Sequence, residues 1–265
     1  MGDLFDIGKA GISAYKSALA TTGQNIANVD TEGYNRRETK IEELSSSSAD
    51  ILSISNSSGL GVRMGEITRA FDQFLDIKLQ SSTSSYSFAK SKSEIFDQLE
   101  STLIPKNATV GTRLREFFDG LSNLAQDPDN ANLRRLALSG ANAVSASISE
   151  LHGGLSDLRT VTHGTLKLTV ADFNSTLKNL SHVQNEILGN SVKSGSPHGL
   201  LDRRDTLLEQ LSEIADISVD YKANGSITVS LGKLGAVGTL LEGATFSEVT
   251  VQSDMNGVKT FVKDN

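Results

Sequence analysis

The residue types that most often do chemistry are present in this chain, but their spacing does not form a metal or catalytic site. The sequence has four histidines and no cysteine, so disulfides, thiolate catalysis and Cys-ligated metals are excluded. His152 and His163 are eleven residues apart, too far to share a metal ion even on one helix face, and no His-Glu-x-x-His pattern occurs. We interpret all four histidines as solvated helix residues: His152, His163, His182 and His198.

Two short polar runs lack the residues that ligand loops require. Gly232-Lys233 has no upstream glycine at the spacing of a phosphate-binding loop. Residues 127–130 offer side-chain oxygens like the start of a calcium loop, but neither the central glycine nor the terminal glutamate follows. We therefore predict an ordinary turn at residues 127–130 and no phosphate site at Gly232.

A third run holds two carboxylates, Asp202 and Asp205, around Arg203 and Arg204. On one helix this spacing suits ion pairs or a cap better than two carboxylates on either side of a substrate. No nucleophile and base stand at a favourable spacing. The sequence thus predicts a protein that is not an enzyme and that needs no cofactor or metal.

Charge and hydropathy narrow the possible partners. The net charge of −7 argues against a nucleic-acid footprint. No apolar run approaches the roughly 20 residues that span a bilayer, and the first 20 residues lack the charged and apolar regions of a cleaved signal peptide. We expect no nucleic-acid partner, no membrane insertion and no cleaved leader.

The N-terminal segment has the spacing of a packing helix. Strongly apolar residues recur seven apart, and weaker positions interleave them, which keeps one stripe facing a partner: Phe5, Ile12, Leu19 and Ile26, with Gly8, Tyr15, Thr22 and Val29. Periodicity alone leaves two alternatives open. The helix docks on its own domain, or it packs against other chains.

The helix should stop near Asn28 to Val29, because the Asn, Asp and Gly residues that follow favour caps and turns. Residues 34–44 are charged and are predicted to form an extended arm. The Ser/Gly-rich residues 45–48 and 53–61 are predicted to form a flexible connection.

The middle of the chain predicts long helices. Residues 67–103 contain neither Pro nor Gly, and Pro105 ends that element. A second helix over 109–125 should bury Leu114, Phe117, Phe118, Leu121 and Leu124. Residues 131–188 would span about 85 Å as one helix, with bends at Gly153, Gly154 and Gly164; two ordinary helices are the alternative. A last helix is predicted over 200–215.

After residue 215 the apolar residues recur at every second position, which is the pattern of β-strands. Residues 217–221 and 226–231 alternate around the turn signal Asn224-Gly225, and 246–252 with 258–262 form a second hairpin candidate around Asn256-Gly257. The fold class is therefore mainly α with a smaller β part. We expect an elongated coiled-coil-like helical bundle (61–215), preceded by an N-terminal assembly helix and arm (1–60) and followed by a partial, truncated β domain (216–265).

Several segments resemble one known family. Gly23-Gln-Asn-Ile-Ala-Asn28 with Thr31-Glu-Gly-Tyr34 resembles the N-terminal signature of flagellar axial proteins, which form the rod, the hook and the hook-associated parts. The following Asn35-Arg36-Arg37 is most similar to members at the hook–filament junction. Three further segments agree with those members: residues 59–62, 67–75 and 200–205.

The resemblance implies a structural, self-assembling subunit of the bacterial flagellum at the hook–filament junction. It implies an extracellular location, reached by type III export without a cleaved peptide. The implied partners are other copies of the chain, the hook protein, a second junction protein and an export chaperone. The alternatives are a non-polymerising coiled-coil adaptor or binding module, and a hook or rod relative. The family also carries further β-domain sequence and a C-terminal helix that pairs with the N-terminal one.

The resemblance also assigns roles to residues of the N-terminal segment. The apolar heptad residues are expected to pack between subunits, and five polar or small residues are expected to shape the arm: Phe5, Ile12, Leu19 and Ile26 for packing, and Asn25, Asn28, Gly33, Tyr34 and Arg36 for the arm.

Overall fold

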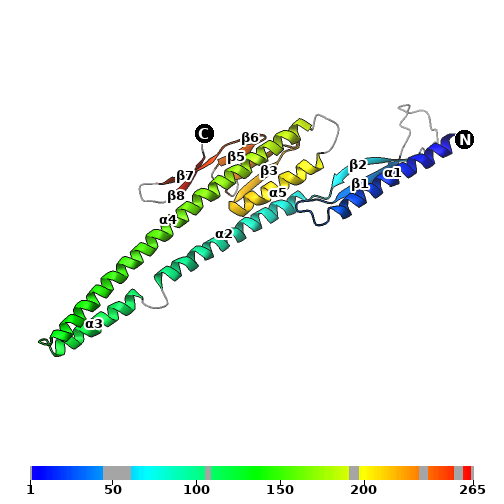
Figure 1. Cartoon of the computed structure of the whole chain (residues 1–265). Coiled ribbons are helices and arrows are strands. Elements are labelled where there is room, and N and C mark those ends of the chain that lie inside the picture. Colours follow the sequence, from blue (N-terminus) through cyan, green and yellow to red (C-terminus); the bar gives the residue numbers. More distant parts are fainter. Residues whose placement is uncertain are drawn as a thin grey trace. The chain divides into compact units, whose positions relative to one another are not determined.

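A computed structural model describes residues 2–43, 61–104, 109–190, 197–232, 238–253 and 259–263 (Figure 1). The elements are α1 (Gly2–Ala27), β1 (Arg37–Glu43), β2 (Val62–Arg69), α2 (Gln73–Leu103), α3 (Val110–Gln126), α4 (Ala131–Asn190), α5 (His198–Ile214), β3 (Ile217–Tyr221), β4 (Ile227–Leu231), β5 (Gly238–Glu242), β6 (Thr245–Phe246), β7 (Val249–Ser253) and β8 (Lys259–Lys263). The predicted class, mainly α with a smaller antiparallel β part, is confirmed.

The chain divides into two compact units. The first contains Met1–Thr83 and Ser175–Glu248, and the second contains Ser84–Asn174 and Val249–Asp264. Helices α2 and α4 each contribute to both units.

In the first unit, α1 ends at Ala27, as the turn-forming residues predicted, and the predicted arm becomes strand β1. Strand β1 pairs antiparallel with β2, with Arg37 opposite Arg69 (Figure 1). The prediction that a helix starts at residue 67 is wrong, because Ile67 and Thr68 belong to this hairpin. Helix α2 starts after Asp72, whose carboxylate accepts hydrogen bonds from two backbone N–H groups of the first turn. The predicted connection lies mostly outside the described residues.

The core of the first unit is formed by the end of α4, by α5 and by the sheet β3-β4-β5-β6. The Asn224-Gly225 hairpin is confirmed, and Gly225 adopts the positive φ of 81° that its turn needs. Polar side chains of α4 hold the loops of this sheet: Ser181 donates to the Ala244 carbonyl at 2.5 Å, and Gln184 donates to the Gly225 carbonyl at 2.8 Å. The buried apolar residues are Leu177, Leu180, Ile187, Leu207, Leu208, Leu211, Ile217, Val219, Ile227, Val229, Leu240 and Leu241.

The second unit contains the rest of α2, α3, the first part of α4 and the hairpin β7-β8. Helix α4 runs unbroken from Ala131 to Asn190, so the prediction of one long helix is confirmed and the alternative of two separate helices is wrong. Gly154 faces α2, where an added Cβ would lie 3.0 Å from the Thr102 methyl group. The glycine thus permits a close approach of two helices. The second hairpin is confirmed as β7-β8, and its Asn256-Gly257 turn lies outside the described residues.

Large apolar side chains on the helices are often exposed. The prediction that α3 buries its apolar side is wrong for Phe118, which is 61 % exposed, and for Leu114 and Leu121. Gly120 is the buried residue of that helix, and Ala137 of α4 lies next to it. Among the described residues, no helix is both long and apolar enough to cross a membrane.

Candidate assembly surface and polar junction

Helix α1 packs on the β1-β2 hairpin through small residues. Ala14 and Thr21 are almost fully buried there, and the hydroxyl of Thr39 on β1 donates to that of Thr21 at 2.9 Å. At the far end of the hairpin, a Cβ added to Gly61 would lie 3.4 Å from the Cα of Ile7. Short side chains therefore let the helix approach its own hairpin closely.

The large apolar residues of α1 lie on a different face. We call Phe5, Ile12, Leu19 and Ile26 the outward stripe, and these side chains are 83, 73, 72 and 69 % exposed. Tyr15 and Val29 from the interleaved positions are exposed as well. The helix thus docks on its own chain, as one alternative proposed, but the heptad residues do not make that contact.

The C-terminal end of α1 is tied to the arm by Asn25. Its side-chain amide donates to the Arg37 carbonyl at 2.8 Å and its oxygen accepts from the Arg37 N–H at 2.9 Å. The same oxygen accepts from the Tyr34 hydroxyl at 2.8 Å. The Arg37 guanidinium lies over the Tyr34 ring. One asparagine therefore fixes how the chain turns from helix into strand.

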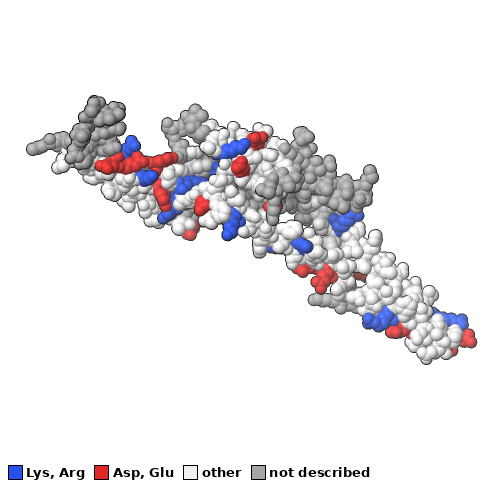
Figure 2. Space-filling view, turned by 180° about the vertical axis from the view of Figure 1, so that it is seen from behind, with Lys and Arg blue, Asp and Glu red and all other residues white. Residues whose placement is uncertain are grey.

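The other predicted arm residues have separate places. Asn28 donates to the Gln24 carbonyl at 2.8 Å, at the helix end. Gly33 has a φ of 75°, and an added Cβ would overlap the Thr206 hydroxyl on α5. Arg36 is exposed and pairs with Glu38 on the hairpin. Figure 2 shows red and blue side chains interspersed over the hairpin end of one face.

A buried ion-pair cluster joins the hairpin to α5. Arg69, at the end of β2, contacts Asp202 at 2.9 Å and Asp205 at 2.6 Å through separate guanidinium nitrogens. Arg204 contacts Asp205 at 2.9 Å, and Arg37 approaches Asp202 at 3.6 Å. The side chains of Arg69, Asp205 and Arg204 are each less than a tenth exposed. Each carboxylate therefore meets two arginines, which compensates the cost of burial.

Neighbouring groups extend this cluster into α2 and β3. The Tyr221 hydroxyl donates to the Asp76 carboxylate at 3.0 Å, and Arg204 lies over the Tyr221 ring. Burial is the main cause that raises the pKa of Asp76, partly opposed by the Tyr221 hydrogen bond. Burial also raises the pKa of Tyr221, so its hydroxyl keeps its proton and remains a donor.

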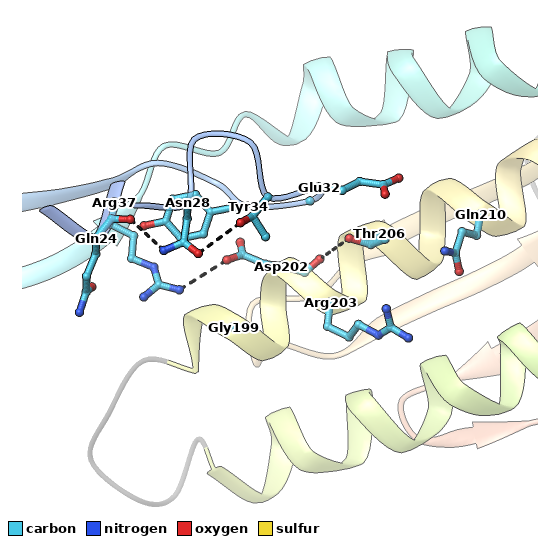
Figure 3. A pocket seen from close by; sticks show the side chains of 12 residues that line it. Gln24, Asn28, Glu32, Tyr34, Arg37, Gly199, Asp202, Arg203, Thr206 and Gln210 are labelled. Carbon is cyan, nitrogen blue, oxygen red and sulfur yellow. Dashed lines mark hydrogen bonds and ion pairs between the residues drawn. The ribbon is translucent and has the colours of Figure 1, made fainter. Parts of the chain in front are cut away.

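A hollow of about 570 Å³ lies between the arm and the first turns of α5. Figure 3 shows Arg37 pointing across it toward Asp202. Thr206 and Arg203 line the α5 side, and Asn28 and Tyr34 line the arm side. Within the described residues, no group of three or more His, Cys, Asp or Glu is arranged to hold a metal ion.

Part of this ion-pair cluster could be predicted from the sequence. The interpretation of Asp202 and Asp205 as ion-pair residues is supported, because Arg204 pairs with Asp205. The sequence did not predict that Arg69, Arg37 and Asn35 meet Asp202. The Asn35 side-chain amide donates to the Asp202 carboxylate at 3.1 Å. All three lie inside segments that carry the family resemblance. The polar and charged residues of those segments were the available signal.

Two family models match segments of this chain. Residues 5–35, which hold most of α1 and the turn after it, match the model of the flagella basal body rod protein family. This match covers only the N-terminal segment, and it agrees with the resemblance of that segment to the flagellar axial proteins.

Residues 96–263 match the family described as the flagellar hook-associated protein FlgK helical domain. This match covers more than half of the chain, which therefore belongs to the flagellar hook-associated protein FlgK family.

Curated relatives agree. The chain is 27 % identical over 260 residues to flagellar hook-associated protein 1 of Bacillus subtilis, covering 92 % of this chain and 51 % of the relative. It is 24 % identical to flagellar hook-associated protein 1 of Salmonella typhimurium, covering 99 % of this chain and 47 % of the relative. The chain spans about half the length of these curated relatives.

A solved structure shows the same fold. The flagellar hook junction protein FlgK from Burkholderia pseudomallei superposes with a TM-score of 0.61 at 22 % identity. The match covers 72 % of this chain and 33 % of that protein.

Proposed function

We propose that this chain is a structural, non-enzymatic part of a flagellar subunit at the hook–filament junction, and that the outward stripe of α1 packs against neighbouring subunits. One observation carries the proposal. The small-residue face of α1 is already covered by its own hairpin, while four large apolar side chains at heptad spacing remain exposed.

The physical driving force is the burial of the outward stripe. Removing a Leu, Ile or Phe side chain from water stabilises an interface by about 1.5–3 kcal/mol. The heptad spacing keeps Phe5, Ile12, Leu19 and Ile26 in one line, so a neighbouring helix can cover them together. Asn25, Asn28, Gly33, Tyr34 and Arg36 shape the turn that leads away from this helix.

The family supplies the setting for this packing. We propose that the partners are other copies of the chain, the hook protein and a second junction protein, with an export chaperone before assembly. The protein would reach the outside of the cell by type III export without a cleaved peptide. Residues 1–60 would serve assembly, 61–215 would form the helical body, and 216–265 would begin the β part.

The test uses the complete gene in the bacterium that carries it. Ile12→Ser and Leu19→Ser are introduced together, and isolated flagella are assayed for the protein by immunoblot. The expected result is secretion of the variant into the medium with loss from the isolated flagella. The matched control is Lys9→Ser with Lys16→Ser, which are exposed, have the same spacing on α1 and lie outside the stripe.

Normal incorporation of the Ile12→Ser/Leu19→Ser protein would contradict packing through the stripe. If neither the unmodified protein nor the Lys9→Ser/Lys16→Ser control were found in isolated flagella, the result would instead favour the non-polymerising adaptor.

A further inference from the structure

The helix α1, the arm and the strands β1 and β2 form a group that we call the α1–hairpin module. Its own bonds hold it together: Asn25 ties the helix to the arm, and Thr39 ties β1 to α1. The β1-β2 ladder adds regular pairing from Arg37 to Glu43. These contacts do not involve α5 or the sheet β3-β4-β5-β6.

The polar contacts of Arg69, Arg37 and Asn35 outside this module converge on one turn of α5. Arg69, Arg37 and Asn35 all reach the Asp202 carboxylate, and Arg69 also reaches Asp205. One turn further along α5, Gly33 lies against Thr206. These contacts between the module and α5 therefore involve only a short length of that helix.

Arg69 is the only described residue of the module that bridges both carboxylates. Its planar guanidinium places one nitrogen on each acid, which fixes a direction as well as a distance. Its guanidinium carbon lies over the Phe71 ring, 4.7 Å from the ring centre, and Phe71 in turn packs edge-on against Tyr221 of β3. Arg69 thus links the base of the hairpin to two elements of the core.

The carboxylates do not depend on Arg69 alone for their charge balance. Asp205 keeps Arg204 as a partner on α5 itself. Asp202 lines the hollow between the arm and α5, so release of the module, which also removes Arg37, exposes this carboxylate to water. Loss of Arg69 therefore leaves no acid both buried and unpaired, so α5 and the sheet can remain folded without it.

We infer that Arg69 is a positioning residue, a latch that locks the α1–hairpin module onto α5 in a single direction. Without the latch, the module, with its Arg37 and Asn35, turns as a unit about residues 70–72 while its internal contacts persist. This inference concerns the chain alone, so it stands or falls separately from the assembly of subunits.

The absence of cysteine from the sequence allows a direct test by spin labelling. One pair, Lys9→Cys with Glu213→Cys, reports the distance from α1 to α5. A second pair, Lys16→Cys with Lys40→Cys, reports a distance inside the module. All four residues are exposed, and distances are measured by double electron–electron resonance on the full chain.

Arg69→Met is compared with Arg63→Met, an arginine of the same strand that is exposed and pairs with Glu42 at 3.0 Å. Arg69→Met is expected to lose the single narrow α1–α5 distance and to keep the narrow distance inside the module. Arg63→Met is expected to change neither. Arg69→Lys should give an intermediate width, because an ammonium lacks the fork that spans both acids.

An unchanged α1–α5 distance in Arg69→Met would overturn the latch. Broadening of both distances, or loss of helical circular dichroism, would also overturn it, because the module and the core must survive the release. Asp202→Asn, which keeps the shape and removes one of the two charges, provides a second variant, and it should broaden the α1–α5 distance less than Arg69→Met because Arg69 keeps Asp205.

Discussion

Two amphipathic helices of the same unit, α1 and α5, use their residues in opposite ways. Helix α5 buries Leu207, Leu208 and Leu211 completely, together with its charged residues Asp202, Arg204 and Asp205. Helix α1 buries Ala14 and Thr21 and exposes every residue of the outward stripe. The apolar side chains of α5 are thus covered by its own chain, whereas the main apolar surface of α1 is not.

The difference is the one expected if the chain folds through one helix and, as we propose, assembles through the other. Large side chains placed inward on α5 stabilise the unit, since their burial requires no partner. Small side chains placed inward on α1 give a close but modest contact. The large residues of α1 then remain available, and we expect changes there to affect assembly more than folding.

The largest expected contrast is between equivalent leucine truncations on the two helices. Leu208→Ala should lower the free energy of unfolding by about 2–5 kcal/mol, because it leaves a cavity at a fully buried site. Leu19→Ala should change it by less than about 0.5 kcal/mol, because this side chain is already 72 % exposed. Urea titrations followed by circular dichroism measure both values. Similar losses in the two variants would contradict the comparison.

A smaller contrast in stability is expected between alanine substitutions at two glycines, one in the arm and one within α1. Gly33→Ala should destabilise the chain by about 1–3 kcal/mol, because the position has a φ of 75° and no room beside Thr206 on α5. Gly23→Ala lies on α1 with nothing within 4 Å of an added Cβ, and should stabilise the helix by about 0.5–1 kcal/mol. Thermal unfolding measures both changes, and we expect a lower melting temperature for Gly33→Ala and a higher one for Gly23→Ala. A stable Gly33→Ala chain would show that the arm is not packed tightly on α5.

The smallest expected effect concerns the polar edge of the α5 cluster. The pKa of Asp76 is raised in the folded chain above its ordinary 3.8, so the stability that the protonated form contributes is lost as pH rises through the raised pKa. Asp76→Asn keeps an acceptor for Tyr221 and removes the buried charge. Its stability relative to the parent should therefore rise between about pH 4 and about pH 7.

Urea midpoints at the two pH values measure this change. Asp220→Asn, an exposed carboxylate on β3, serves as the control and should show no comparable rise. A variant whose relative stability falls toward neutral pH would mean that the ionised Asp76 stabilises the junction.

The elements of the fold could be predicted from local pattern, but the face that each helix buries could not. The heptad of α1 and the Asn224-Gly225 turn are local signals, and both elements form as expected. Large apolar residues usually mark the buried face, so Ala14 and Thr21 gave no sign that they carry the contact with the hairpin. The same reasoning failed on α3, where Gly120 rather than Phe118 is buried.

The junction was harder to predict because its charges come from distant segments. Arg69 pairs with residues 133 and 136 positions away along the chain. No periodicity joins such positions. Only the family resemblance of the segments around Tyr34, Arg69 and Asp202 placed them in one set, and it did so without indicating that they meet.

The central claim is that the outward stripe of α1 becomes covered when subunits assemble. The most direct test is the alkylation rate of Leu19→Cys, placed in the complete protein with any native cysteine replaced by serine, in free subunits and in isolated flagella. Ala14→Cys, on the face that packs against the hairpin, should react slowly in both states. The account predicts fast alkylation of Leu19→Cys in free subunits and strong protection in flagella, and equal fast rates in both states would contradict it.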